Sequence, residues 1–371
     1  MSRLEELIQQ YCPDGVEYKP LKDILRIRNG RDYKHLDKGL IPVYGSGGIM
    51  TYVDTPMYSK PSVLIPRKGS IDKLYYVDTP FWNVDTVFYT EIDTSKVVEK
   101  YVYYVLQKEH LEKLNTAGGV PSLTQGVLNE VLIPVPPLPV QEEIVRILDN
   151  FAELQAELQA ELQKRLQQYN YYRDKLLSFS DLSDWGGQEV SIEWKKLEEC
   201  CQIWDNKRKP ITKGARVAGE YPYYGANGVQ DYVADYIFDG KYVLVGEDGS
   251  VITPNGTPVV NWAEGKIWVN NHAHIISEKE GVLLRYLFHY LQIINITPLI
   301  HGNIPKLTGG DFRALNIPVP PLPVQEEIVR ILNKFYDLTS DLTAGLPAEI
   351  EARRKQYEYY RDKLLTFKKK A

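Results

Sequence analysis

The chain has 371 residues, of which 43% are hydrophobic and 25% are charged, and its formal net charge at pH 7 is −5. This length is too great for one ordinary core and the balance is that of a folded protein, so we expect at least two domains. The slight acidity argues against a simple basic nucleic-acid binder, the three cysteines make no disulfide framework, and without an apolar leader or long apolar run we expect a cytoplasmic protein.

Residues 1–138 mix short β-like runs with turn signals. The runs Ser62–Ile65, Leu74–Val77 and Thr86–Tyr89 are rich in β-branched and aromatic residues, and glycines lie between them. A helical pattern follows at residues 96–114, where apolar side chains recur every three or four positions. We therefore predict a small α+β domain over residues 1–138.

A proline-rich stub and a long helix follow, at residues 139–180. The sequence Pro-Pro-Leu-Pro ends the domain as a stiff polyproline II segment, and Pro139 suits the first turn of a helix. After Pro139 and as far as Phe179 neither proline nor glycine occurs, and apolar residues form a stripe that is typical of a helix packed along another long helix. The residues predicted to pack are Ile144, Phe151, Leu154, Leu158 and Leu162.

The second half begins with another predicted α+β domain, at residues 181–322. Strand-like runs occupy Tyr242–Val245 and Ile267–Val269. A helical pattern follows near residues 283–293. The order of the predicted elements is therefore the same as in residues 1–138.

A second long helix is predicted over residues 323–371. Gly345-Leu-Pro347 should kink or break it, because proline cannot continue the hydrogen-bond ladder of a helix. Two long helices separated by a whole domain most simply pack antiparallel, which predicts two domains at opposite ends of a rod with a pseudo-twofold axis between them. The residues predicted to pack are Ile328, Phe335, Leu338 and Leu342.

The two halves are copies of one unit. Residues 133–148 and 317–332 share the sixteen letters IPVPPLPVQEEIVRIL, and YYRDKLL recurs at residues 171–177 and 359–365. The domain before each proline-rich block has diverged, which indicates one scaffold that carries two variable domains. Near-twofold symmetry of this kind is typical of proteins that read a two-part DNA site.

The sequence contains no convincing catalytic site. Both the phosphate-binding loop of nucleotide hydrolases and the Gly-x-Ser-x-Gly nucleophile elbow are absent. His272 and His274 would share one face of a strand, but no third ligand lies near them at metal-binding spacing, so we interpret them as ordinary sheet histidines and predict no metal site. Cys200 and Cys201 are interpreted as buried packing residues rather than reactive thiols.

Basic and polar residues in the turns of both domains are the candidates for DNA contacts. Lysine and arginine bind phosphates, and arginine, asparagine and glutamine also read base edges. Charged runs usually belong to an ordinary solvated surface, and both interpretations stay open. The candidates are Arg28, Arg31, Lys34, Arg67, Lys68, Lys73, Lys207, Arg208, Lys209, Lys213, Arg216, Asn227 and Lys306. The loop residues that persist in both copies are interpreted as scaffold or backbone-contact positions rather than base readers: Gly45, Gly225, Pro121 and Pro305.

The duplicated Pro-Leu-Pro-x-Gln-Glu-x-Ile block, the helix ending in Tyr-Tyr-Arg-Asp-Lys-Leu-Leu and the divergent domain before each block resemble the specificity subunit of type I restriction-modification enzymes. The resemblance covers essentially the whole chain. It implies two target recognition domains joined by two conserved helices in an antiparallel coiled coil, and a bipartite target in double-stranded DNA. Because the recognition domains of this family vary, the resemblance assigns no base-reading residue.

The same resemblance implies a subunit that is not itself an enzyme and binds no cofactor. Such subunits bind two modification subunits, which carry S-adenosylmethionine and methylate adenine N6. Restriction subunits would add DNA translocation and cleavage with ATP and Mg²⁺. The chain would therefore direct where its partners act.

Two other classes of protein remain open from the sequence. An enzyme with duplicated catalytic domains would carry a matched polar constellation in both copies, whereas Thr86 and Phe88 stand in the first copy where His272 and His274 stand in the second. A coiled-coil scaffold with two peptide-binding domains would have no affinity for duplex DNA, even with its partners present.

Overall fold

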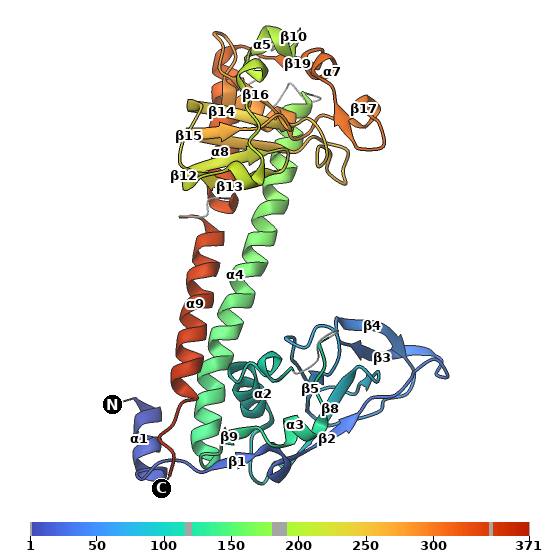
Figure 1. The fold of residues 1–371 in the computed structure, drawn as a ribbon, viewed down its shortest axis with the longest axis vertical. Helices are drawn as coiled ribbons and strands as arrows, with labels where there is room; N and C mark the ends of the chain where they lie inside the picture. The colour runs from blue at the N-terminus through green and yellow to red at the C-terminus, as the bar shows by residue number, and fades with distance from the viewer. Residues whose placement is uncertain (1, 116–120, 180–190, 341–343, 371) are drawn as a thin grey trace. The chain divides into compact units, whose positions relative to one another are not determined.

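The computed structural model of this chain describes residues 2–115, 121–179, 191–340 and 344–370. The chain divides into two compact units (Figure 1). Unit 1 consists of residues 1–159 and 349–371, and unit 2 consists of residues 160–348. In the described ranges, no helix is both long and apolar enough to cross a membrane.

The domain of unit 1 combines three sheets with short helices. Its elements are α1 (Arg3–Tyr11), β1 (Tyr18–Pro20), β2 (Leu25–Asn29), β3 (Lys38–Gly45), β4 (Gly48–Val53), β5 (Ser62–Pro66), β6 (Tyr75–Val77), β7 (Trp82–Asn83), β8 (Val87–Ile92), α2 (Glu99–Lys108), α3 (Gln125–Asn129) and β9 (Leu132–Pro134). The strand orders are β2-β8-β5-β6 and β4-β3-β7, and β1 pairs with β9. The strands predicted at 62–65, 74–77 and 86–89 are confirmed as β5, β6 and β8.

The domain of unit 2 repeats the main strands and the helix after them, with one larger sheet and an additional β17–β18 pair. Its elements are β10 (Glu193–Lys196), α5 (Leu197–Cys200), β11 (Gln202–Ile203), β12 (Ala218–Gly225), β13 (Gly228–Val233), β14 (Phe238–Gly246), β15 (Val260–Val269), β16 (Ala273–Ser277), α6 (Leu284–Leu291), β17 (Ile300–His301), β18 (Lys306–Leu307), α7 (Gly309–Arg313) and β19 (Asn316–Val319). Six strands are ordered β11-β16-β14-β15-β12-β13, while β10 pairs with β19 and β17 with β18. The predicted α+β domain is therefore present in each unit.

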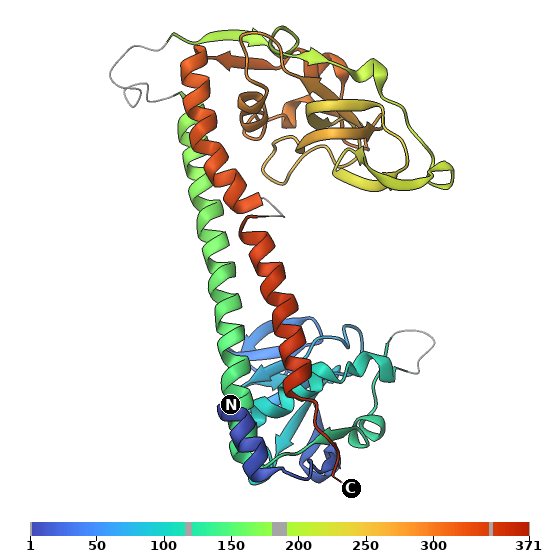
Figure 2. The same cartoon turned by 90° about the vertical axis from the view of Figure 1, so that its left-hand side faces the viewer.

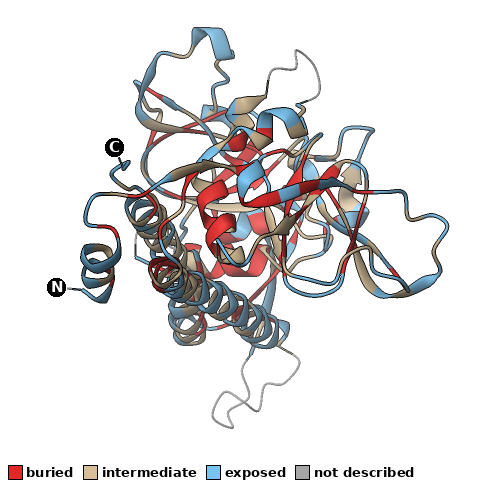
Figure 3. Cartoon of the chain, turned by 90° about the horizontal axis from the view of Figure 1, so that it is seen from below, coloured by how far each residue is buried: buried red, intermediate tan, exposed pale blue. Residues whose placement is uncertain are grey.

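Each domain has its main core between a sheet and the helix that follows it. In unit 1, Val63 and Ile65 of β5 share a buried cluster with Tyr101 of α2. In unit 2, Val243 of β14 shares a buried cluster with Tyr286 of α6. Buried residues gather on these strands and helices, whereas the long helices are mainly half-buried or exposed (Figure 3).

The predicted long helix is confirmed as α4 (Leu138–Ser178), which has 41 residues. Its partner consists of two helices, α8 (Leu322–Ser340) and α9 (Leu346–Leu364). The expected break near Gly345 and Pro347 is therefore confirmed as well. At 1.5 Å per residue, α4 is roughly 60 Å long.

Within each unit, α4 lies beside part of its partner in the antiparallel direction (Figures 1 and 2). In unit 1 the ring of Phe151 stacks on that of Tyr360, with centroids 5.6 Å apart. In unit 2 the ring of Phe335 stacks on that of Tyr172, with centroids 5.4 Å apart. The same aromatic pair thus recurs in both copies, with the roles of the two long helices exchanged.

The residues predicted to pack between the helices differ in their surroundings. Ile144 and Ile328 are fully buried, but they belong to the domain cores. Leu338 is 38% exposed. Leu154, Leu158 and Leu162 are half-buried along α4, and Leu342 lies outside the described residues.

The C-terminal segment lies against the start of the chain, as the antiparallel arrangement predicts. The backbone N–H of Val16 donates to the carbonyl of Lys368 at 2.8 Å, and that of Lys370 donates to the carbonyl of Val16 at 2.9 Å. Gly15 has φ +107°, and a Cβ there would lie 2.6 Å from the Lys368 carbonyl oxygen. Only glycine permits this close approach.

Two predictions about local structure were wrong in detail. The helix expected over residues 96–114 ends at Lys108, and a 3₁₀ turn at Leu111–Leu114 follows. His110 adopts a left-handed backbone conformation with φ +51°, which ends the helical path. His272 lies in the turn before β16 rather than on the strand with His274.

Candidate functional site

A hollow with a volume of about 580 Å³ opens in unit 2 where four loops meet. We call it the unit 2 hollow. It lies beside the turn between β12 and β13, the loop after β14, the turn before β16 and the loop before β18. Its polar lining consists of Asn227, Gln230, Asp248, Ser250, His272 and Lys306. Asn227 and Lys306, both predicted to contact DNA, are therefore brought together here.

A buried asparagine holds two sides of the unit 2 hollow. The Asn270 amide group donates to Gln230 Oε1 at 3.4 Å, and Asn270 Oδ1 accepts from the His272 backbone N–H at 2.8 Å. The His272 ring contacts the Asp248 carboxylate, while Lys306 Nζ lies 3.5 Å from Glu247 Oε1. The lining is thus held in place at several points and still faces solvent.

The glycine at the end of β12 has a steric role. A Cβ on Gly225 would lie 2.0 Å from Nε2 of Gln230, so the amide lies directly over this glycine. Unit 1 repeats the arrangement, because a Cβ on Gly45 would lie 2.5 Å from the sulfur of Met50. Pro305 and Pro121 each have a carbonyl that accepts from the backbone N–H of a loop glycine, Gly249 or Gly69. These contacts support the interpretation of the four residues as scaffold positions.

The basic candidates of unit 1 have different surroundings. Arg28 forms an ion pair with Glu91 at 3.1 Å, and Arg67 places its guanidinium 5.0 Å from the centre of the Phe88 ring. Nε of Arg67 is buried and has no hydrogen-bond partner among the described residues. The remaining candidates are exposed: Arg31, Lys34, Lys68 and Lys73.

In unit 2 two of the predicted arginines are engaged within the domain. The Arg208 side chain is 12% exposed and bonds to Glu247 at 2.5 Å and to the carbonyl of Ala273 at 2.7 Å. Arg216 lies over the ring of Tyr223 at 4.2 Å and pairs with Asp231 at 3.1 Å. The lysine candidates are exposed: Lys207, Lys209 and Lys213.

His274 has acidic neighbours that the sequence spacing did not indicate. Its ligand atoms and those of Asp205 and Glu247 lie within 4.8 Å of one another. Its Nδ1 is 2.7 Å from Asp205 Oδ2 and its Nε2 is 3.1 Å from the Leu307 carbonyl, so both ring nitrogens have partners. Burial alone would raise the pKa of Asp205, but the hydrogen bond and charge of His274 lower it overall. With Arg208 also bonded to Glu247, the cluster is an internal ion network that joins β16 to its neighbours.

The adjacent cysteines are both buried. Burial raises the pKa of the Cys201 thiol to about 12, and Sγ lies 3.2 Å from the Leu197 carbonyl. A thiol that stays protonated is a weak nucleophile. These contacts fit the predicted packing role.

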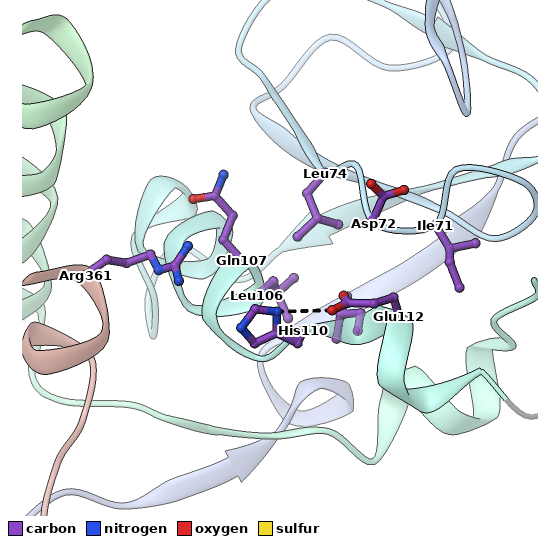
Figure 4. A pocket seen from close by; sticks show the side chains of 9 residues that line it. Ile71, Asp72, Leu74, Leu106, Gln107, His110, Glu112 and Arg361 are labelled. Carbon is purple, nitrogen blue, oxygen red and sulfur yellow. Dashed lines mark hydrogen bonds and ion pairs between the residues drawn. The ribbon is translucent and has the colours of Figure 1, made fainter. Parts of the chain in front are cut away.

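In each unit, a tyrosine of one long helix contacts a glutamine of the domain. In unit 1, Tyr357 of α9 donates to Oε1 of Gln107 on α2 at 3.1 Å. In unit 2, the Tyr169 hydroxyl of α4 lies 3.3 Å from Oε1 of Gln292, just after α6. Beside the contact in unit 1 is a small cavity of about 260 Å³, with Arg361 on one side and Leu74 and Asp72 on the other (Figure 4).

Sequence reasoning did not place four polar lining residues in this site: Gln230, Asp248, Ser250 and His272. A signal was present in the repeat. YGSGGIMTYV aligns with YGANGVQDYV and PRKGS with GEDGS. The glycines at 45, 48 and 69 recur at 225, 228 and 249, while most residues between them change. These positions carry neutral or acidic side chains, which a pattern of basic residues does not indicate.

Comparison with known proteins gives a consistent result. A model of the type I restriction modification DNA specificity domain matches residues 13–168 and 190–352. A putative type I restriction enzyme specificity subunit of Haemophilus influenzae is 47% identical over 179 residues, which is 47% of this chain and 46% of that protein. A type I restriction enzyme specificity subunit of Escherichia coli is 30% identical over 312 residues, or 76% of this chain and 74% of that protein. The alignment with the Haemophilus protein thus spans less than half of either chain.

A solved structure has the same fold over nearly its whole length. The S subunit of a type I restriction-modification system from M. genitalium superposes with a TM-score of 0.67 and 17% sequence identity. The superposition covers 95% of this chain and 96% of that one. At this identity the likeness concerns the fold alone.

Proposed function

Since this chain belongs to the type I restriction-modification DNA specificity family, we propose that it is the DNA-recognition subunit of a type I restriction-modification complex. Each domain reads one half of a bipartite site in double-stranded DNA. The observation that carries this proposal is the pair of domains with one fold and different loop side chains. A duplicated scaffold with two variable surfaces fits two different half-sites.

The chain itself is proposed to be non-catalytic and to position enzymes. Two modification subunits carry S-adenosylmethionine and methylate adenine N6, and restriction subunits use ATP and Mg²⁺. We expect this complex to work in the cytoplasm, beside the DNA that it modifies. Modest charge on this subunit is compatible with that role, because partner subunits can supply further phosphate contacts.

The two sixteen-residue blocks support two equivalent partner sites. Many of their residues are buried and serve the fold, but Pro137 and Glu142 are exposed in the first block and Pro321 and Glu326 in the second. Exposed residues that are identical in two copies are available for the same contact twice. We therefore propose one modification subunit on each block.

Co-expression with the modification subunits tests this function. The purified complex should contain two modification subunits per chain by native mass measurement. Sequencing of its methylated DNA should reveal N6-methyladenine in one bipartite motif. A complex that binds no duplex DNA in a gel shift would contradict the proposal and favour a peptide-binding scaffold.

Exchange of one domain is the matched control for modularity. Replacing residues 181–316 with the corresponding domain of another family member should change one half-site and leave the other intact. If both half-sites changed together, the assignment of one half-site to each domain would be wrong.

A further inference from the structure

The loops around the unit 2 hollow keep the same backbone plan in unit 1. The tight turn after β3 ends in Gly48 with φ +121°, and the turn after β12 ends in Gly228 with φ +93°. The loop after the next long strand forms the same isolated bridge in both units, Lys68 with Ser122 and Asp248 with Lys306. The two domains therefore present side chains from matching positions.

Every polar lining position compared across the two units carries a different side chain, apart from the matching serines Ser70 and Ser250. The pairs, with the unit 1 residue first, are Gly47 and Asn227, Met50 and Gln230, Lys68 and Asp248, Thr86 and His272, and Ser122 and Lys306. Fold stability does not demand these differences, because the unit 2 residues lie at a solvent-facing surface. Retained backbone with replaced side chains is what two recognition surfaces for different sequences require.

Gln230 has the chemistry and the placement for reading a base. Its amide lies over Gly225, and the hydrogen bond from Asn270 fixes which way Oε1 faces. An amide oxygen has two lone pairs, so Oε1 can still accept a second hydrogen bond while Nε2 donates one. This paired acceptor and donor matches N6 and N7 on the major-groove edge of adenine.

The neighbouring groups add further polar and charged atoms around the Gln230 amide. The Asn227 side chain is exposed and has no hydrogen bond to the part of the chain that the structure describes. The Lys306 side chain is 46% exposed and supplies a positive charge at the rim, where a phosphate contact is favourable. The Asp248 carboxylate beside His272 places an acceptor on the opposite wall.

We propose that the unit 2 hollow receives the major-groove edge of the half-site read by the second domain, and that Gln230 contacts an adenine there through both amide atoms. This inference rests on the proposed function and specifies one of its contacts. In unit 1 the equivalent position is Met50, which has no donor and only a weak acceptor, so the first domain cannot read adenine from this position.

Two substitutions test the contact in the complete complex with its modification subunits. Gln230→Ala removes both amide atoms, and discrimination at one adenine of the second half-site should fall about tenfold to a hundredfold. Gln230→Glu leaves only acceptors, and a carboxylate accepts from cytosine N4, so the preferred base at that position should change from adenine to cytosine. The readout is the frequency of each base in the methylated motif.

A glycine variant moves the amide without removing it. Gly225→Ala forces the flexible end of Gln230 away, with no positive φ to strain, and should cause the same loss as Gln230→Ala. Controls are Gly45→Ala and Met50→Ala, which should leave the second half-site unchanged, and Gln202→Ala, which removes an exposed glutamine on β11.

The outcomes separate this contact from the function on which it rests. A bipartite methylation motif in the parent complex with an unchanged second half-site in Gln230→Ala and Gln230→Glu would overturn the contact alone. Absence of any bipartite motif in the parent complex would overturn both. Relaxation confined to one position of the second half-site supports the contact.

Discussion

The two domains follow one strand order but complete their sheets differently. In unit 2 the ten-residue strand β15 pairs with β14 and, at its end, with β12, so six strands form one sheet. In unit 1 the same stretch is divided into β6 and β7 on either side of Pro80, and the strands fall into sheets of four and three. Proline has no N–H to donate and interrupts a ladder of hydrogen bonds.

The last residues of this stretch nevertheless make the same parallel pairing in both units. Val43 pairs with Trp82 in parallel register, as Tyr223 pairs with Trp268. Each tryptophan donates its ring N–H to a backbone carbonyl of the loop that follows β2 or β11, at Arg31 or Lys209. The fold therefore tolerates a break in the sheet as long as this anchored pair keeps its position.

The contacts between each domain and its long helix show no such divergence. Gln141 accepts a hydrogen bond from the Val98 N–H at 2.9 Å, and Gln325 accepts one from the Leu283 N–H at 2.9 Å. Each glutamine also donates to two backbone carbonyls and is completely buried. The sixteen-letter block is identical in both copies in part because its buried glutamine completes a network of hydrogen bonds that no other side chain would complete.

The largest loss of stability is expected when the buried glutamine of this network is replaced in either copy. Gln141→Met or Gln325→Met keeps the volume but leaves one N–H and two carbonyls without partners, and each unsatisfied buried group costs roughly 1–3 kcal/mol. We expect each variant to lose about 3 kcal/mol of stability in its own unit. Urea unfolding followed by hydrogen exchange would measure the loss separately for the two units.

The exposed neighbours Glu142 and Glu326 provide matched controls in the same turn. Their substitution by glutamine should change stability by less than about 0.5 kcal/mol. A loss in one copy without a comparable loss in the other would contradict the equivalence of the two networks.

Tyr104 in unit 1 and His289 in unit 2 occupy equivalent positions, but Tyr104 has a charged partner and His289 has neutral ones. In unit 1 the Tyr104 hydroxyl donates to Asp149 at 2.5 Å, and Lys100 pairs with the same carboxylate at 2.8 Å. In unit 2 the equivalent group is His289, whose ring nitrogens face Asn333 at 3.0 Å and Tyr169 at 3.1 Å. Burial lowers the pKa of His289 to about 3 from its ordinary 6.5.

Acid should therefore weaken unit 2 at this position. Because the pKa in the folded state is the lower one, the unfolded chain binds the proton first as the pH falls. The stability from the neutral ring is complete above about pH 6.5 and is lost progressively toward pH 3, which amounts to about 2 kcal/mol at pH 5. His289→Gln should remove this pH dependence, whereas His301→Gln at an exposed site should keep it. Unfolding midpoints of unit 2 at pH 7.5 and pH 5 give the comparison, and an equal slope in parent and His289→Gln would refute it.

Much of the architecture could be predicted because it depends on sequence patterns that extend over more than one helix or strand. The absence of proline and glycine after Pro139 predicted α4, and the repeat predicted that the two long helices lie antiparallel. The stop of α2 at Lys108 was missed, because the left-handed conformation of His110 leaves no mark in hydrophobic spacing.

Predicting the candidate site was harder, because its residues come from separate loops. From the sequence alone, Arg208 is expected to be a surface cation. In the structure it contacts Asp205 and Glu247, because β11 and β14 both pair with β16. Asn227 and Lys306 were named from their residue type, whereas Gln230 becomes visible only when its amide is seen over Gly225. Loop neighbours far apart in the sequence require the structure.

A four-residue deletion in α4, the helix that both units share, should have the smallest effect on stability. It should also have the most specific effect on function. Residues 152–163 read AELQ three times, and Leu154, Leu158 and Leu162 are half-buried at the same four-residue step. Deleting Ala156–Gln159 keeps that stripe, so the fold should lose less than about 1 kcal/mol. Glu157→Gln, which keeps the length, is the control.

The deletion shortens α4 by about 6 Å and turns one end by about 40° relative to the other. One base pair of DNA advances about 3.4 Å and rotates about 35°, so the change in rotation corresponds to one base pair. Because neither recognition surface is altered, both half-sites should stay the same while the spacer between them shortens by one base pair. Methylated sites mapped across a genome would measure the spacer directly. An active deletion variant with an unchanged spacer would mean that the repeat only fills the helix, since alanine, glutamate, leucine and glutamine all favour helix formation whatever they separate.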